Sequence, residues 1–263
     1  SILFFTLICG LLWPFANASA EDAAPQTPSK VFLPMISRLY NPGMVVGKVV
    51  DASTGKALPG VHVCVGKICG NSTSTGRYAL QLAEGAYGML AIKTGYYNFT
   101  RPVKVETGKS IEVTVSMSPN DLGADELRIV LTWTGEGDPS NPNDSDLDAN
   151  LWIYQGPHIY WQNPGNCAVD GVCLENDSFQ FGPETIVIKK KFPGIHAYAV
   201  NRNASDFEIT QFGALVTIYD SSGAIATFAS PSSGAGSWWY VFDLTGETGE
   251  ITLVNQISSS APH

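Results

Sequence analysis

Charge is sparse in this sequence, and positive charge is the sparsest. Of its 263 residues only 15% are charged, and 15 Lys and Arg stand against 24 Asp and Glu, which leaves a net charge of −9. Nucleic acids and anionic membranes bind proteins through basic surfaces, so this balance argues against both as partners and favours divalent cations. The one basic run, Lys189–Lys191, is expected to be a solvated strand end. Hydrophobic residues make up 44% of the chain, which predicts a folded core.

Catalytic motifs are missing as well. The sequence has no G-x-S-x-G elbow, no H-E-x-x-H pair and no glycine-rich loop that leads into a helix. His62, His158 and His196 are isolated along the chain, so none of them is expected to be a general base. We therefore expect a protein that is not an enzyme. A hydrolase that uses a pair of carboxylates stays open as an alternative.

Long hydrophobic runs are absent except near the beginning of the sequence. Residues 2–15 are mostly apolar and are followed by Ala18-Ser19-Ala20, which fits an A-x-A cleavage site. We expect residues 1–20 to be a secretory signal peptide and residues 21–43, rich in Pro, Ala, Ser and Thr, to be a linker. The apolar run is short for a helical span, so no membrane span is expected in the mature chain. A retained anchor is the alternative.

Cysteine is scarce, and none of it has the C-x-x-C spacing of a zinc or redox motif. Cys9 falls inside the expected signal peptide. The other four cysteines form two local pairs, Cys64 with Cys69 and Cys167 with Cys173. In VCVGKIC, a two-residue turn at Gly66-Lys67 would place the first pair opposite each other across a hairpin. We therefore predict two structural disulfides and a secreted, extracellular or cell-surface location.

Short alternating runs of apolar and polar residues are what the chain does contain. From about Met44 to Ser118 they include VVGKVVDA, VHVCVG, YALQL and IEVTVSM, which predict antiparallel strands. The stretch GKVVDASTGKALPGVHVCVG, followed by STGRYALQLAEGAYGMLAIKTGYY, resembles the carboxypeptidase regulatory-like family, whose fold is a transthyretin-like seven-stranded sandwich. Thr54-Gly55 and Pro59-Gly60 supply turns in this pattern. The resemblance implies a non-catalytic spacer or binding module over residues 44–119.

A second set of strands runs over residues 126–257 and precedes a tail at 258–263. Runs such as LRIVLTW, LDANLWIY, ALVTIYD and WWYVFDL predict a sandwich of about eight strands. The segments LTW, SDLDANL, FGPETIVI and WWYVFDLTGE resemble the YfaP-like group of secreted bacterial domains, in which a D-L-D-x-H-L strand follows an L-T-W strand. Asn150 stands where that pattern usually has His. The expected fold is therefore all-β, with two tandem β-sandwich domains after the signal segment and linker.

Three aspartates alternate where a loop enters one of these strands, in NPNDSDLDANLWI. Asp144, Asp146 and Asp148 have the D-x-D-x-D spacing that opens an EF-hand loop. The rest of that motif fails, because Ala149 replaces the required glycine and Gln155 replaces the terminal glutamate. An EF-hand is therefore excluded. In an extended segment the three carboxylates would share one face and repel one another unless a cation or water separates them.

A second acidic stretch, LENDSFQFGPE, follows further along the chain. If the two loops meet at one end of the sandwich, their carboxylates would supply the oxygen ligands that Ca²⁺ prefers. The predicted calcium ligands are Asp144, Asp146, Asp148, Asp177 and Glu184. Hydrated loop acids without a metal are the alternative.

Aromatic residues indicate another kind of site. Trp152 and Tyr154 follow the first acidic loop, and Trp239 lies in a late aromatic cluster. Alternate side chains of a strand face outward, where a ring can stack on a sugar; a place in the core or at its rim is the alternative. We therefore expect a secreted or cell-surface, non-catalytic binding or adhesion protein, with a cell-surface protein or a polysaccharide as its partner.

Overall fold

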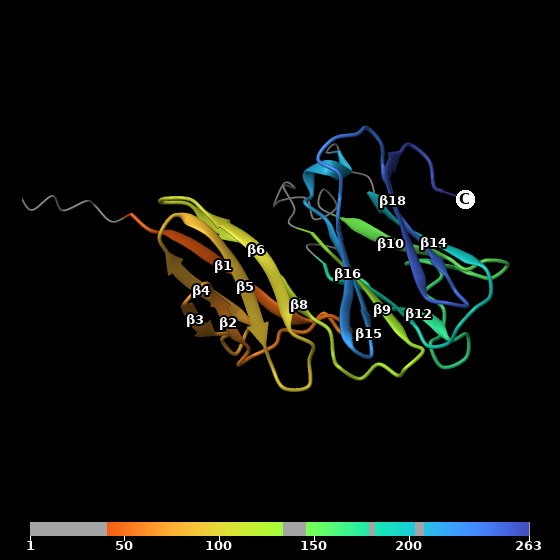
Figure 1. Ribbon diagram of the computed structural model, residues 1–263, viewed down its shortest axis with the longest axis horizontal. Coiled ribbons are helices and arrows are strands. Elements are labelled where there is room, and N and C mark those ends of the chain that lie inside the picture. The colour runs from red at the N-terminus through yellow and green to blue at the C-terminus, as the bar shows by residue number, and fades with distance from the viewer. Residues whose placement is uncertain (1–40, 134–145, 179–181, 203–207, 263) are drawn as a thin grey trace, which may run out of the picture. The chain divides into compact units, whose positions relative to one another are not determined.

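The chain folds almost entirely into β-strands. The computed structural model describes residues 41–133, 146–178, 182–202 and 208–262. They belong to one compact unit, Asn41–His263, and form strands β1 to β18 and a short 3-10 helix, η2 (Ile209–Gln211), which confirms the predicted all-β class (Figure 1). The predicted signal peptide lies outside the described residues and stays a prediction. Within the described ranges no helix has the length and apolar character of a membrane span.

Strands β1 to β8 form the first sandwich. They are β1 (Gly43–Asp51), β2 (His62–Val65), β3 (Ile68–Asn71), β4 (Arg77–Leu82), β5 (Gly85–Ile92), β6 (Phe99–Val105), β7 (Ser110–Glu112) and β8 (Val115–Met117). One sheet has the order β4-β1-β7, with β8 also pairing with β1, and the other has the order β3-β2-β5-β6. Buried side chains from both sheets share one core.

Strand β4 illustrates how the alternating sequence builds this core. Its residues RYALQL are exposed and buried in turn, so Tyr78, Leu80 and Leu82 face inward. The turn before β4 requires Gly76, whose φ is +76° and where a Cβ would lie 2.5 Å from the carbonyl oxygen of Val49. The polar end of Tyr78 is accommodated as well, since its hydroxyl donates to the Val113 carbonyl at 2.6 Å.

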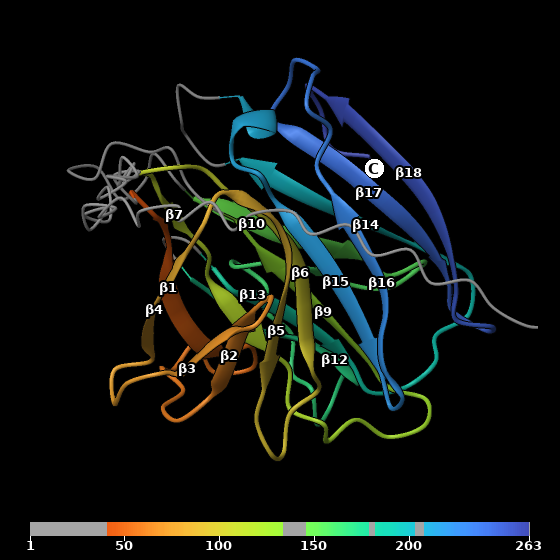
Figure 2. The ribbon, with the colours of Figure 1, turned by 60° about the vertical axis from the view of Figure 1, so that its left-hand side comes forward.

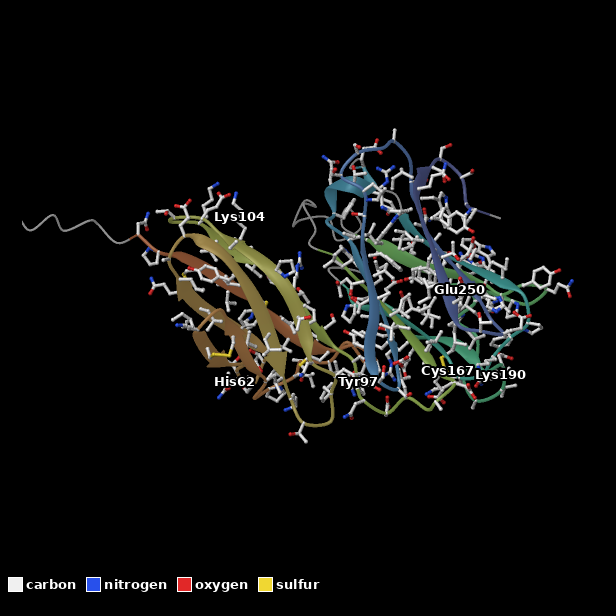
Figure 3. The ribbon with its side chains drawn as sticks, in the orientation of Figure 1. His62, Tyr97, Lys104, Cys167, Lys190 and Glu250 are labelled. Atoms are coloured by element: carbon white, nitrogen blue, oxygen red, sulfur yellow. A yellow bond between two sulfur atoms is a disulfide. The ribbon has the colours of Figure 1, made fainter. Side chains whose placement is uncertain are left out.

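Both predicted disulfides are present. Cys64 in β2 lies opposite Cys69 in β3, on either side of the turn at Gly66, and the two are bonded. The second bond joins Cys167 to Cys173 in the other sandwich; Figure 3 draws disulfides as yellow bonds and labels Cys167. Each bond closes a short local loop.

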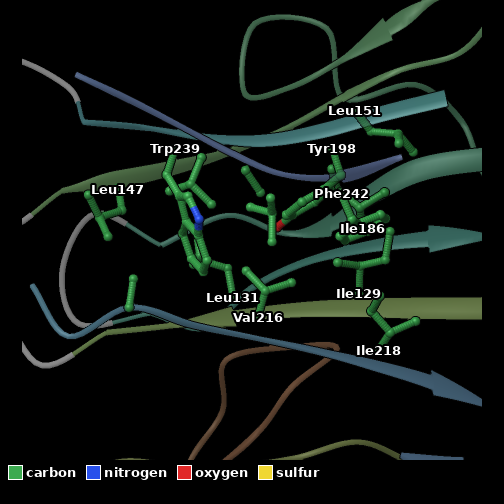
Figure 4. Close-up of a cluster of buried hydrophobic side chains, with 14 of the residues drawn as sticks. Ile129, Leu131, Leu147, Leu151, Ile186, Tyr198, Val216, Ile218, Trp239 and Phe242 are labelled. Carbon is green, nitrogen blue, oxygen red and sulfur yellow. The ribbon is translucent and has the colours of Figure 1, made fainter. Parts of the chain in front are cut away.

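Strands β9 to β18 form the second sandwich. They are β9 (Leu127–Thr132), β10 (Leu147–Trp152), β11 (His158–Ile159), β12 (Val172–Asn176), β13 (Glu184–Ile188), β14 (Ile195–Arg202), β15 (Leu215–Asp220), β16 (Gly223–Ala229), β17 (Trp238–Thr245) and β18 (Glu250–Ser258). One sheet has the order β11-β10-β14-β17-β18, part of which Figure 2 shows side by side. The other sheet has the order β12-β13-β9-β15-β16. Between them lies a core in which the Tyr198 and Phe242 rings stack with centroids 5.0 Å apart (Figure 4).

A buried arginine ties the segment after β8 to the second sandwich. Arg128 in β9 is completely buried and donates to the Ser118 hydroxyl, the Pro119 carbonyl and the carboxylates of Asp121 and Glu175, at 2.9–3.1 Å. Four acceptors compensate the cost of burying its charge. The sequence pattern did not single out Arg128, because its partners come from separate segments of the chain.

Candidate functional site

One edge of strand β10 is only partly paired. β10 pairs with β14 along its whole length, but the described part of the chain pairs its other edge only through β11, at Leu151 and Trp152. Ahead of that pairing, the N–H of Ala149 donates instead to Glu184 Oε2 at 2.6 Å. Glu184 begins β13 in the opposite sheet, so its side chain bridges the two sheets at this edge.

Two aspartates join Glu184 there and form what we call the acid cluster: Asp146, Asp148 and Glu184. Their exposed fractions are 7%, 4% and 1%, and each offers a carboxylate oxygen within 4.8 Å of the others. One oxygen of each residue, Asp146 Oδ1, Asp148 Oδ2 and Glu184 Oε1, has no hydrogen-bond partner within the described residues. A buried carboxylate oxygen without a donor is costly, so this arrangement requires a compensating partner.

The pKa values of the acid cluster also indicate that its carboxylates require a compensating partner. Burial, together with the charge of Asp177, raises the pKa of Asp146 to about 6. Burial and the charges of Asp146 and Asp177 raise the pKa of Asp148 to about 7. Burial raises the pKa of Glu184 well above its usual range, and the neighbouring acids add to this although the Ala149 N–H opposes it. Three carboxylates therefore lack a balancing positive charge from the described side chains and must bind either protons or a cation.

The donor set defines which cation would fit. All available atoms are carboxylate oxygens, which are hard ligands suited to Ca²⁺, Mg²⁺ or Mn²⁺ rather than to metals that prefer sulfur or imidazole. The predicted ligand Asp177 lies in the loop after β12; its side chain is exposed and contributes to the raised pKa values of all three cluster members. The remaining predicted ligand, Asp144, lies outside the described residues.

A second group of possible ligands lies in the first sandwich and differs in kind. His62, Cys64 and Cys69 place ligand atoms within 4.8 Å of one another, and His62 Nε2 is 3.3 Å from Cys64 Sγ. Both sulfur atoms are in the disulfide, whereas metals are bound by thiolates. This group therefore has a structural role at the hairpin.

The predicted aromatic residues are not brought together. Trp152 is half-buried and Tyr154 is 54% exposed, whereas Trp239 is completely buried in the core, where its indole N–H donates to Asn255 Oδ1 at 2.8 Å. The prediction that Trp239 contacts a ligand at the surface is therefore wrong. The register of β17 turns Trp239 inward and its neighbour Trp238 outward.

A small hollow lies beside the acid cluster on the outer face of the β10 sheet. We call it the aromatic pocket; it has a volume of about 210 Å³ and is lined by Asp148, Asn150, His158, Tyr160, Trp161, Asn201 and Trp238. Asp148 belongs to both the acid cluster and this pocket. Only alternation along the strands could have suggested the pocket from sequence, and the loop residues Tyr160 and Trp161 carry no such signal.

The family comparison identifies part of the chain. A sequence model described as CarboxypepD_reg-like domain matches residues 45–129, which include β2 to β8, and this confirms the resemblance in the first part of the chain. The resemblance of residues 126–257 to the YfaP-like group is not confirmed by this comparison and stays a prediction. No curated protein matches the chain.

The chain has a low similarity to several solved structures. A protein of unknown function from Bacteroides fragilis NCTC 9343 is 20% identical, with 40% of this chain and 34% of that one covered and a TM-score of 0.26. A candidate carbohydrate-binding protein from Bacteroides uniformis ATCC 8492 is 9% identical, with coverages of 71% and 97% and a TM-score of 0.26. The major pilin subunit of Bacillus cereus is 13% identical, with coverages of 72% and 67% and a TM-score of 0.29.

These likenesses carry no argument about function, because all of the TM-scores are low. The chain spans only 34% of the Bacteroides fragilis protein. Residues 45–129 thus match the CarboxypepD_reg-like domain family, and the rest of the described chain is characterised by its β-sandwich fold.

Proposed function

We propose that the protein is a secreted or cell-surface, non-catalytic binding protein whose second sandwich is stabilised by Ca²⁺ at the acid cluster. The observation that carries this proposal is the set of three carboxylates, each more than nine-tenths buried and each with one oxygen lacking a described donor. A divalent cation between Asp146, Asp148 and Glu184 would supply the missing partner for all three. It would also join the two sheets, because Glu184 and the aspartates come from opposite sides of the sandwich.

Calcium suits this place better than magnesium. Ca²⁺ accepts six to eight oxygens in irregular geometry, whereas Mg²⁺ requires a near-ideal octahedron and usually retains several waters. Ligands contributed by a loop, a strand and the opposite sheet favour the more tolerant ion. Asp177 is close enough to influence all three members and is available as a further ligand.

Burial also supports the non-catalytic part of the proposal. Carboxyl groups with raised pKa values are typical of general acids, which is the chemistry of the alternative hydrolase. A general acid must reach the atom that it protonates, however, and these groups expose only 1–7% of their surface. The two disulfides support export, since such bonds persist in oxidising compartments.

Thermal unfolding with and without calcium tests the proposal. At a concentration one hundred times the dissociation constant, a native-state ligand adds about 2.7 kcal/mol. For a protein of this size we expect the midpoint to rise by roughly 5–10 °C in calcium relative to a chelator. Glu184→Gln should lose most of this rise.

The matched control is Glu250→Gln, which changes an exposed glutamate of the same sandwich that Figure 3 labels. This variant should keep the full response to calcium. An unchanged midpoint in the wild-type protein, or an equal rise in Glu184→Gln, would show that the acid cluster is not a calcium site.

A further inference from the structure

We propose that the aromatic pocket binds one neutral sugar unit of an extracellular glycan. The proposal deepens the binding function proposed above by assigning a ligand class to a specific site. The pocket lining consists of aromatic or imidazole rings and of short polar side chains, without Lys, Arg or an aliphatic residue. Rings stack on the apolar face of a sugar, and amides pair with its hydroxyl groups.

Strand register places the polar groups of the pocket in a row. Asp148 in β10 is the partner of Asn201 in β14, and Asn201 is in turn the partner of Trp238 in β17. Adjacent partners on one face of a sheet lie about 5 Å apart. The amide of Asn201 is therefore held between a carboxylate and an indole ring, which is a suitable arrangement for a ring that carries hydroxyl groups at its edge.

A small residue lies next to this row. Ala199 is the neighbour of Asn150 in β10 and of Tyr240 in β17. Ala199 is completely buried and does not belong to the pocket lining, so the row of polar groups ends beside it. The pocket volume of about 210 Å³ lies below the roughly 300–1,000 Å³ of sites for drug-sized ligands, so it suits a single ring-sized unit.

The wall of the pocket is held in place by ring stacking. The His158 ring lies between Trp152 and Tyr160, with centroids 4.2 Å away on both sides and interplanar angles of 9° and 10°. Trp152 also contacts Trp238, at 5.7 Å between centroids. A wall that is ordered before binding reduces the entropy lost when a ligand binds.

Hydrogen bonds fix the orientation of the same groups. The Asn150 amide nitrogen donates to the Asp148 carbonyl at 3.0 Å, which leaves its oxygen to accept from His158 Nε2 at 2.9 Å. The carbonyl of His158 in turn accepts from the Asn163 amide at 2.8 Å. Two hydrogen bonds, from Asn150 to Asp148 and from His158 to Asn150, therefore connect the acid cluster to the stacked rings.

Asp148 is the only acidic side chain of the pocket lining, which has no Lys or Arg. Burial lowers the pKa of His158 to about 4, so its imidazole is neutral at physiological pH. Asp148 is only 4% exposed, so little of its carboxylate is available to a ligand in the pocket. Trp161, by contrast, is 47% exposed and offers its ring to solvent. These properties favour a neutral ligand with hydroxyl groups.

Calorimetric titration of the calcium-loaded protein with neutral oligosaccharides tests the proposal. The probes are hexasaccharides of β-glucan, mannan, xylan and chitin. We expect at least one of them to bind, and Trp161→Ala to weaken that binding at least tenfold. Leu253→Ala is the matched control, because Leu253 is 51% exposed in the same sandwich but lies outside the pocket lining; the affinity of this variant should stay within twofold of the wild type.

The outcomes separate this proposal from the calcium proposal. Failure of all four probes to bind, or equal losses in Trp161→Ala and Leu253→Ala, would overturn the sugar site. Binding of choline or of a heparin fragment at this site, without binding of a neutral probe, would also overturn it. Binding that depends on Trp161 in a protein with no thermal response to calcium would support the sugar site and refute the calcium function.

Discussion

Two buried aspartates, one in each sandwich, have opposite surroundings and opposite pKa shifts. Asp51 in the first sandwich is 9% exposed and accepts hydrogen bonds from the Ser53 N–H and hydroxyl, the Thr54 N–H and the Tyr96 hydroxyl, at 2.7–3.1 Å. Burial raises its pKa, but the bonds from Ser53, Tyr96 and Thr54 outweigh this effect and lower the pKa below its usual value. Asp148 in the second sandwich is buried among other acids, and its pKa is raised to about 7.

The difference separates a structural carboxylate from one that requires a ligand. Asp51 has three of its donors within three residues and the fourth on Tyr96, between β5 and β6, so the fold alone satisfies it. Asp148 has an oxygen without a described donor and lies next to Asp146 and Glu184. Burial by itself therefore does not indicate function; burial without donors does.

The largest effect should follow from removing the satisfied carboxylate. Asp51→Ala removes the acceptor of four hydrogen bonds. A hydrogen bond to a charged group contributes about 1.5–3 kcal/mol, and four bonds to one carboxylate contribute less than four times this value. We expect the free energy of unfolding to fall by roughly 3 kcal/mol, equally in calcium and in chelator. Denaturant unfolding of the wild type and the variant, once with calcium and once with chelator, measures this fall. A loss that depends on calcium would contradict the contrast between the two aspartates.

The effect of Asp148→Asn on the free energy of unfolding should change sign between chelator and calcium. In chelator this variant removes one of several mutually repelling buried charges, so it should stabilise the protein by about 1–2 kcal/mol. In saturating calcium it removes a ligand and should destabilise the protein by about 2 kcal/mol relative to the wild type. Thermal unfolding in the two buffers tests this reversal, and the same sign in both would count against a cation at the cluster.

The pH dependence of stability should be smaller and should appear only without calcium. Because the folded-state pKa values of Asp146 and Asp148 lie near 6 and 7, above the unfolded value of 3.8, the folded protein binds more protons in this window. Stability should therefore be highest at acidic pH and fall as pH rises from about 4 to 7.

The lowered pKa of Asp51 acts in the opposite direction, since its contribution is present above pH 3.8 and is lost only as the pH falls below that value. Unfolding in urea at pH 5 and pH 8, in chelator and in calcium, isolates the effect of the acid cluster, because both pH values lie above the range in which Asp51 loses its contribution. If the free energy of unfolding depended on pH equally in calcium and in chelator, calcium would not replace the protons of the acid cluster.

Much of this fold could be predicted because its signals are local. Alternation in RYALQL identified an inward face, and the VCVGKIC turn brought Cys64 opposite Cys69. The predictions for Asp146 and Asp148 followed from their spacing, and that for Glu184 from its position after the second acidic loop. Trp239 was assigned to the wrong face, because two adjacent tryptophans at the start of β17 give no indication of which one faces inward.

The sequence by itself determined the all-β class, the two disulfides and the approximate place of the acids, because strand periodicity and turn residues act over a few positions. Only the tertiary structure decided which acids meet, that Glu184 reaches Ala149 from the opposite sheet, and that the rings of Trp152, His158 and Tyr160 stack. It also decided that Arg128 is buried with acceptors from four residues. These contacts depend on register and on the packing of sheets whose strands are far apart in the chain, which no local pattern encodes.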